Sequence, residues 1–175
     1  MATTTQQQFD MKVLRSLLRE VLSLPSGAVR PSYQTGPSGA EPFVIASVLT
    51  SVEIGTTRQD FDGAREIERL STARLTTVSI EAYGNNAYEL MQKLTTLLQA
   101  SSTQAMMRTS LKAGLVTLSP LRDLTTVIGA GPEERAQFDA TFSHTHIVEI
   151  EQHRIEHAQL ITCPDAHPTH SVPLI

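Results

Sequence analysis

The segment that decides the fold reads Glu134-Arg-Ala-Gln-Phe-Asp-Ala-Thr-Phe-Ser-His-Thr-His-Ile-Val-Glu-Ile150. Apolar residues occupy every second position of its first half, at Ala136, Phe138, Ala140 and Phe142. Because side chains on a β-strand alternate between two faces, this spacing predicts a long strand with one buried and one solvated face. Such a strand specifies a sheet, and none of its residues specifies a chemical reaction.

The composition predicts one domain with a mostly neutral surface. The chain has 175 residues, enough for one hydrophobic core and short for two. Charged residues make up only 18%, so Ser, Thr and Gln must cover much of the surface, which suits lasting protein contacts. The net charge of −4 disfavours a nucleic-acid-binding domain, which needs clustered Lys and Arg. We expect a single domain over residues 1–175, with an ordered core over about 9–163 and an extended tail over 164–175.

The cysteine content and the N-terminal residues predict a soluble protein made in the cytosol. A single cysteine, Cys163, excludes an internal disulfide and fits a reducing compartment. The first eight residues lack the basic cluster and the apolar run of a signal peptide. No window approaches the roughly 20 apolar residues that span a bilayer.

The first half of the chain predicts one helix and one strand around loops. A polar, frayed start precedes an amphipathic helix over Phe9–Leu24, in which apolar residues recur with helical spacing. Residues 25–42 are rich in Pro and Gly and predict an ordered loop. Val, Ile, Thr and Phe then predict a strand over Pro42–Ile54. The charged segment Gly55–Thr72 is expected to be a long hairpin loop.

The second half predicts strands grouped around two helices. A strand over Arg74–Tyr83 should point Val78, Ile80 and Ala82 inward and Thr77, Ser79 and Glu81 outward. Asn86 is expected to cap the next helix together with Glu89, and a shorter helix should run from Ser102 or Thr103 to Lys112. Short strands follow over 115–118 and 124–128, and Ile155–Cys163 is a plausible partner of the long strand. This order predicts an α+β fold, a mostly antiparallel sheet flanked by two or three helices.

Side-chain patterns associated with catalysis or metal binding are incomplete. The histidines lie between His144 and His170, but His144 with His146 requires a strand while His153 with His157 requires a helix, so a convergent metal site is disfavoured. The run from Asp60 places glycine at the wrong position for an EF-hand loop. Dinucleotide, phosphate-loop and nucleophile-elbow motifs are also absent from the sequence. These observations predict a protein that is not an enzyme and has no metal or cofactor.

Two small charged clusters remain as candidates for structural or contact roles. Arg122 and Asp123 adjoin each other after a predicted strand, where a local ion pair or a subunit contact is possible. Arg135 and Asp139 share the solvated face of the long strand and are close enough for a cross-strand network. If exposed, either pair would contribute at most about 1 kcal/mol to stability.

Three segments, in this order, resemble a known family. They are Leu75-Thr-Thr-Val-Ser-Ile-Glu-Ala-Tyr-Gly84 running into Ala87-Tyr-Glu-Leu-Met-Gln-Lys-Leu94, then Leu118-Ser-Pro-Leu-Arg-Asp-Leu124, then Glu134-Arg-Ala-Gln-Phe-Asp-Ala-Thr-Phe142. The set resembles the neck or tail-terminator family of tailed bacteriophages. There a strand ending in an aromatic-Gly turn leads into an amphipathic helix, and an Arg-Ala-Gln-Phe-Asp strand closes the sheet. The resemblance covers residues 40–150, and its last segment is the most specific.

The resemblance implies a structural subunit of the virion neck, assembled in the host cytoplasm. Copies would form a closed ring, typically a hexamer, that caps the tail tube and docks on the head-side connector or head-closure protein. The tail sheath is a further candidate partner, DNA would pass through the lumen without specific binding, and no membrane is involved. A head-closure protein of the same neck, a small metal-binding protein using the C-terminal histidines, and a monomeric binding module remain as alternatives.

On this interpretation, charged residues make the contacts between subunits or with the tube. The segment Arg58–Arg69 is predicted to reach a neighbouring subunit or the tail tube, because long charged loops usually carry function. The complete set of predicted contact residues is Arg58, Asp60, Asp62, Arg65, Glu66, Glu68, Arg69, Arg122, Asp123, Arg135 and Asp139.

Overall fold

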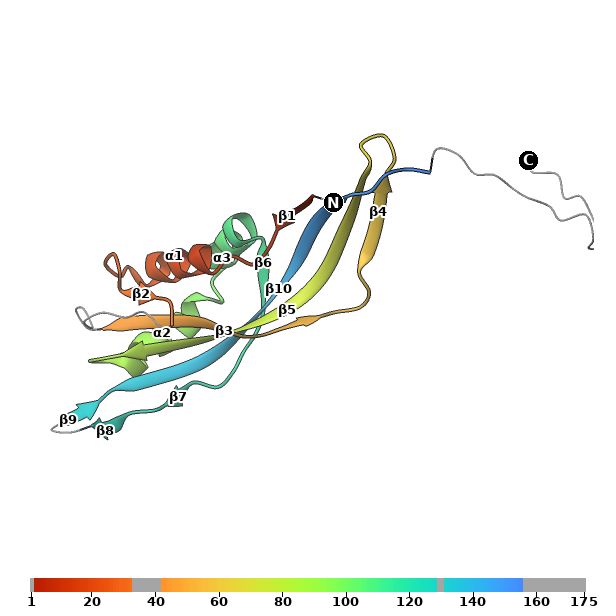
Figure 1. The fold of residues 1–175 in the computed structure, drawn as a ribbon. Coiled ribbons are helices and arrows are strands. Elements are labelled where there is room, and N and C mark those ends of the chain that lie inside the picture. Colours follow the sequence, from red (N-terminus) through yellow and green to blue (C-terminus); the bar gives the residue numbers. More distant parts are fainter. Residues whose placement is uncertain (1, 33–41, 129–130, 156–175) are drawn as a thin grey trace, which may run out of the picture.

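Three long antiparallel strands organise the molecule. The computed structural model describes residues 2–32, 42–128 and 131–155. Its central strands are β3 (Phe43–Glu53), β5 (Ile67–Tyr83) and β10 (Arg135–Glu151), and β5 lies between the other two (Figure 1). The β5–β10 pairing runs without interruption from Arg135 opposite Tyr83 to Glu151 opposite Ile67. The result is an α+β fold, as the sequence predicts.

Short strands complete the two sides of this sheet. On its outer side, β10 pairs antiparallel with β7 (Arg122–Asp123), β6 (Ala113–Leu118) and β1 (Thr3–Gln7). On the opposite side of the sheet, β2 (Val29–Arg30) pairs parallel with the start of β3, and β4 (Arg58–Asp62) pairs with the start of β5. A separate two-stranded sheet joins β8 (Thr126–Ile128) and β9 (Gly131–Glu133).

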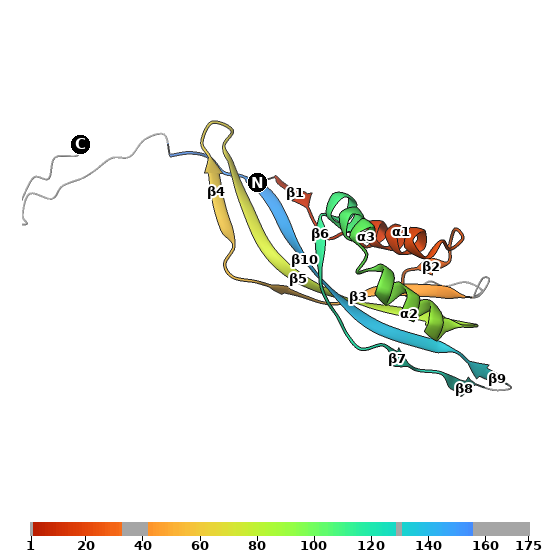
Figure 2. The same cartoon turned by 180° about the vertical axis from the view of Figure 1, so that it is seen from behind.

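The helices all lie on one face of the sheet, as the view from behind also shows (Figure 2). They are α1 (Met11–Leu22), α2 (Ala87–Leu97) and α3 (Ser101–Met106), which continues as the π-helical turn η1 (Met107–Leu111). Their apolar side chains pack on one parity of the strands. The largest fully buried side chains include Leu14, Leu18, Met91, Leu94, Ile80, Phe138 and Phe142.

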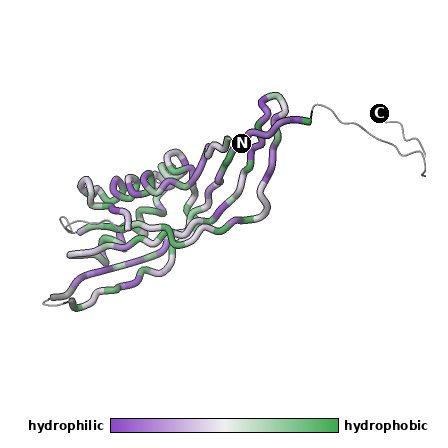
Figure 3. The backbone as a smooth tube through the Cα atoms, in the orientation of Figure 1, coloured by the Kyte–Doolittle hydropathy of each residue, from purple (hydrophilic) through white to green (hydrophobic). Residues whose placement is uncertain are grey.

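The sheet continues well beyond the helices as a projecting arm (Figure 1). We define the arm as β1, β4, residues 67–72 of β5 and residues 146–151 of β10, with the turn that joins β4 to β5. Apolar positions concentrate in the helix-covered half, whereas hydrophilic and hydrophobic positions mix along the arm (Figure 3). The molecule therefore has a covered half with a dry core and an arm held by strand pairing.

Several predicted elements are confirmed, with adjusted ends. The first helix begins at Met11, because Asp10 is its N-cap and accepts hydrogen bonds from the N–H groups of Lys12 (2.7 Å) and Val13 (3.4 Å). It ends at Ser23, whose backbone is left-handed (φ 55°). Of the predicted loop over residues 25–42, residues 33–41 lie outside the described part of the chain. The alternation in β10 is confirmed, since Ala136, Phe138, Ala140 and Phe142 are all fully buried.

Two predictions about loops and termini are wrong. The start of the chain is not frayed, because Thr3–Gln7 pairs with residues 147–150 of β10 as β1. Gly55–Thr72 is not a long loop but mostly paired strand, with unpaired residues at 55–57 and a turn over residues 63–66. Its charged residues obscured the pattern, because both faces of an exposed ribbon can be polar. The predicted strand Ile155–Cys163 and the tail 164–175 fall, apart from Ile155, outside the described residues.

Two predictions about helix starts are also wrong, and one outward-facing strand residue is less exposed than predicted. Asn86 makes no side-chain capping bond and has a left-handed backbone (φ 62°); its N–H instead donates to Glu134 Oε2 at 2.6 Å. The N-cap of α3 is Ala100, so neither Ser102 nor Thr103 fills that role. Ser79 lies on the helix-free face, as predicted, but is only 2% exposed. A network of side chains on the helix-free face accounts for this burial.

Candidate functional site

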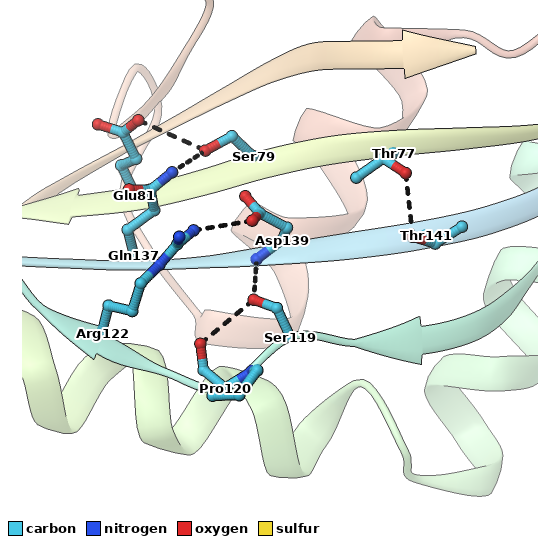
Figure 4. A network of polar contacts seen from close by, with 9 residues as sticks. All are labelled: Thr77, Ser79, Glu81, Ser119, Pro120, Arg122, Gln137, Asp139 and Thr141. Atoms are coloured by element: carbon cyan, nitrogen blue, oxygen red, sulfur yellow. Dashed lines mark hydrogen bonds and ion pairs between the residues drawn. The ribbon is translucent and has the colours of Figure 1, made fainter. Parts of the chain in front are cut away.

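The helix-free face of the covered half carries three neighbouring groups of hydrogen-bonded polar side chains (Figure 4). Ser79 lies near its centre, accepting from Gln137 Nε2 at 2.7 Å and donating to Glu81 Oε1 at 3.4 Å. Thr77 and Thr141 share a hydroxyl–hydroxyl bond of 3.0 Å one step further along the strands. Neighbouring side chains thus satisfy and cover groups that would otherwise contact water on an open sheet face.

Arg135 is fixed at one end of this face by Glu81 and Tyr83. Its guanidinium donates to Glu81 Oε2 at 2.6 Å and lies 5.0 Å from the centre of the Tyr83 ring. The Tyr83 hydroxyl donates to the same carboxylate at 2.7 Å. Burial raises the pKa of Glu81, but the hydrogen bonds from Tyr83 and Arg135 outweigh it and leave that pKa below its ordinary value of 4.5. Burial and the bond to Glu81 raise the pKa of Tyr83 to about 12.

A second ion pair connects residues 119–122, which follow β6, to β10. Arg122 Nη2 donates to Asp139 Oδ2 at 2.7 Å, and the backbone of Asp139 exchanges hydrogen bonds with Ser119, each of 2.8 Å. Asp139 Oδ1 is buried without a hydrogen-bond partner among the described residues. Asp123 does not pair with Arg122; it accepts from the N–H and hydroxyl of Thr125, and these bonds lower the pKa of its carboxyl group.

The predicted cross-strand network of Arg135 with Asp139 is therefore wrong in its pairing. Each residue has a different partner, Glu81 for Arg135 and Arg122 for Asp139. Alternation along β10 placed both residues on the correct face, but partners on other strands depend on the register between strands. Glu81, Ser119 and Gln137 were missed as members of this site for that reason.

The seven other predicted contact residues lie on the arm, away from this network. Asp62 accepts from the N–H groups of Ala64 and Arg65 at 3.0 and 3.2 Å, which fixes the β4–β5 turn. The Glu66 carboxylate contacts His153 at 3.1 Å and Arg154 at 3.7 Å. Its backbone is left-handed, with φ of 54°. The remaining arm pairs are Arg58–Asp60 at 2.7 Å and Arg69–Glu149 at 3.4 Å. The predicted contact residues therefore form two groups, one on each half of the molecule.

Of the histidines in the described region, His144 and His146 share one face of β10, as predicted, and His153 lies apart from them. His144 Nε2 bonds the Thr76 hydroxyl at 2.8 Å, and its ring lies 5.1 Å from that of Phe9; burial is the main cause that lowers its pKa. His153 contacts Glu66 at the arm turn. Within residues 2–32, 42–128 and 131–155, no three His, Cys, Asp or Glu residues are grouped to hold a metal ion. His157, His167, His170 and Cys163 lie outside the described residues.

Comparison with known proteins assigns the family. No helix in the described part of the chain has the length and apolar character needed to cross a bilayer. No curated protein matches this chain. The model of the phage neck terminator protein family matches residues 11–165, a range that includes both the covered half and most of the arm. The chain therefore belongs to the phage neck terminator family, and it is a structural protein of the bacteriophage neck, a component of the virion that interacts with other neck and tail proteins.

Proposed function

We propose that this chain is a tail terminator subunit, six copies of which close into a ring that caps the tail tube and docks on the head-side connector. The single observation that carries the proposal is the family match over residues 11–165. In this role the protein is not an enzyme and needs no cofactor.

The arm and the free side of the sheet support ring formation. A closed ring needs two different surfaces on each subunit, because the contact is head to tail. The arm carries the predicted contact residues from Arg58 to Arg69 and projects beyond the helices (Figure 1). We infer that it contacts a neighbouring subunit or the tail tube. The helix-free face, with Arg122, Arg135 and Asp139, supplies a second contact surface, and Asp123 lies beside it on the same edge strand.

DNA passage is compatible with the charge of the chain. A formal net charge of −4 per subunit makes the ring acidic as a whole. Tight DNA binding requires clustered cations, which release counterions from the phosphates. The ring therefore lets DNA pass through its lumen without specific binding, and tail sheath, where a tail has one, attaches to its outer side.

The test is electron microscopy of particles made without this protein and with defined variants. Loss of the protein should yield tails of irregular length that do not join heads, and the wild-type chain should restore normal virions. A deletion of residues 58–66 closed by a short Gly linker should give a folded chain that fails to restore them. An unfolded deletion variant would refute the assignment of the arm as a contact element.

The same particles separate the terminator from a head-closure protein. Without a terminator, filled heads remain closed and tails are abnormal. Without a head-closure protein, tails are normal in length and heads lose DNA. Normal tails in the absence of this chain would therefore overturn the proposed function.

A further inference from the structure

The two faces of the arm differ in chemical character. Four apolar residues lie on the helix side of the arm: Phe61, Leu70, Val148 and Ile150. Directly paired residues share a face, and Val148 pairs with Leu70, while Phe61 and Ile150 both pair with Glu68. Phe61 is 50% exposed and the other three are partly exposed. We call these four residues the arm stripe. An amphipathic sheet buries its apolar face against another layer, and no helix lies over the stripe in the described chain.

A groove of matching character lies between the start of α1 and the second half of β3. Two adjoining hollows, of about 320 and 300 Å³, share Val48 as a wall. Phe9 and Met11 form the helix side of this α1–β3 groove, and Val48 and Leu49 form its strand side. Val48 and Leu49 are each about half exposed, so the groove offers apolar area that no described residue covers.

The charges of the stripe and the groove are complementary. Arg15 and Arg74 line the groove, and its lining contains no carboxylate. Arg74 is oriented by Ser51, donating to its hydroxyl at 3.1 Å and its carbonyl at 3.2 Å. Neither arginine forms an ion pair with any described residue. Glu68, which lies between Phe61 and Ile150 on the same face as the arm stripe, has none with them either.

The local shape of β3 favours side-chain docking over strand addition at this edge. The register with β5 shifts between Val48 and Thr50, so Leu49 forms a bulge. A bulge interrupts the regular row of backbone donors and acceptors that an added strand would need. The exposed side chains of Val48 and Leu49 remain available to an inserted aromatic ring.

We propose that the arm stripe of one copy packs in the α1–β3 groove of a second copy, with Phe61 inserted beside Leu49 and Glu68 paired with Arg15 or Arg74. This inference rests on the proposed ring and specifies its subunit contact. The stripe and the groove are different surfaces, as a head-to-tail contact requires. A central aromatic residue surrounded by a charged rim is also typical of residues that dominate binding.

Three variants test the contact by sedimentation over a range of concentrations. Phe61→Ser removes the inserted ring, and Leu49→Glu places a carboxylate in the groove. Each should weaken self-association by at least about 30-fold, the effect expected for a dominant interface residue. Val127→Ser is the matched control, because Val127 is 76% exposed but belongs to neither surface. It should assemble as the wild type does.

Mixing the two defective variants gives the decisive result. The Leu49→Glu chain keeps its stripe and the Phe61→Ser chain keeps its groove, so an equimolar mixture should form one-to-one pairs although each chain alone stays monomeric. Pair formation also demonstrates that both variants are folded. A mixture that stays monomeric overturns the contact.

The remaining outcomes separate this inference from the proposed ring. If the wild type assembles and either defective variant assembles equally well, the contact is wrong and the ring stands. If the wild type stays monomeric at every concentration and on tail tubes, both are wrong. If Phe61→Ser forms rings but no longer binds tubes, the arm stripe contacts the tail tube, and the proposed contact with a second copy is wrong.

Discussion

The covered half and the arm share two strands, yet they are stabilised differently. Both β5 and β10 have 17 residues and run through both regions. In the covered half their inward side chains, such as Ile80 and Phe138, are fully buried beneath helices. In the arm the corresponding side chains, such as Leu70 and Val148, lie under no helix. Backbone pairing can extend a strand beyond its core, and the extension then presents a surface for another molecule.

The inward side chains of β10 change from fully buried to partly exposed after Phe142. Up to Phe142 every inward residue is fully buried, and His144 and His146 follow on the same face with partial exposure. Thr76 and Ser51 continue this polar row across the sheet, joined by a hydroxyl–hydroxyl bond of 2.9 Å. The core therefore ends in a hydrogen-bonded border, and the apolar residues beyond it belong to the arm.

The strongest test of this comparison is truncation of one aromatic residue on each side. Phe138→Ala should lower the free energy of unfolding by about 3–5 kcal/mol, because a fully buried ring is lost and a cavity remains. Phe61→Ala, in the arm, should lower it by less than about 1 kcal/mol, because that ring is half exposed. Chemical denaturation of the dissociated chains measures both. Equal losses would mean that the arm contributes to the core and is not a separate contact element.

Period-two alternation was sufficient to predict the covered half. Ala136, Phe138 and the inward residues of β5 are regularly spaced, and burial selects for that spacing. The helix stripes of α1 and α2 are equally regular. The family resemblance also rested on these segments, which is why fold and family could both be predicted.

The arm and the polar pairs were harder to predict for two physical reasons. An exposed ribbon has no buried face to enforce alternation, so the sequence of Gly55–Thr72 predicts a loop. The polar pairs depend on register: Arg135 meets Glu81 because Tyr83 lies directly opposite Arg135 on β5. The sequence of one strand predicts which face a charged side chain occupies. It does not predict the contact partner, because that depends on the register with the neighbouring strand.

The second test uses pH to compare ion pairs in the two regions. Glu81→Gln should lower stability by about 1–2 kcal/mol at pH 7, because two hydrogen bonds to a partly buried carboxylate are weakened. The folded-state pKa of Glu81 lies below 4.5, so its contribution is complete above pH 4.5 and is lost as pH falls through the folded-state pKa. The difference between wild type and variant should therefore shrink in acid.

The matched arm variant is Glu149→Gln, whose partner Arg69 has a half-exposed side chain. Its effect at pH 7 should stay below about 0.5 kcal/mol: the Glu149 side chain is only 16% exposed, but its contact with Arg69 is long at 3.4 Å, and solvent screens the half-exposed guanidinium. Thermal unfolding from pH 7 to pH 3 measures both variants. If the stability difference between the wild type and Glu81→Gln stayed constant over this range, the Glu81 carboxylate would not be stabilised by its partners.

The third test concerns the start of α2. Glu134 accepts the Asn86 N–H at 2.6 Å, the part of the capping box that the sequence predicted for Glu89. Glu134→Ala should therefore cost about 1 kcal/mol of stability, the usual effect of losing a helix cap. Glu133→Ala removes the same charge from an exposed neighbour and should change stability by less than about 0.5 kcal/mol. Equal effects of the two substitutions in chemical denaturation would assign the loss to charge alone.

The smallest expected effect compares two exposed arginine pairs with the same separation. Arg122–Asp139 and Arg58–Asp60 both have contacts of 2.7 Å, but Asp139 is 22% exposed whereas Asp60 is 46% exposed. A double-mutant cycle on the first pair should give a coupling of about 0.5–1 kcal/mol, because the Asp139 side chain is partly buried on a paired strand. The second pair should give no measurable coupling, because both of its side chains are free in solvent. If the coupling energies were equal, strand context would have no effect on surface pairs, and the arm would be as rigidly organised as the polar face.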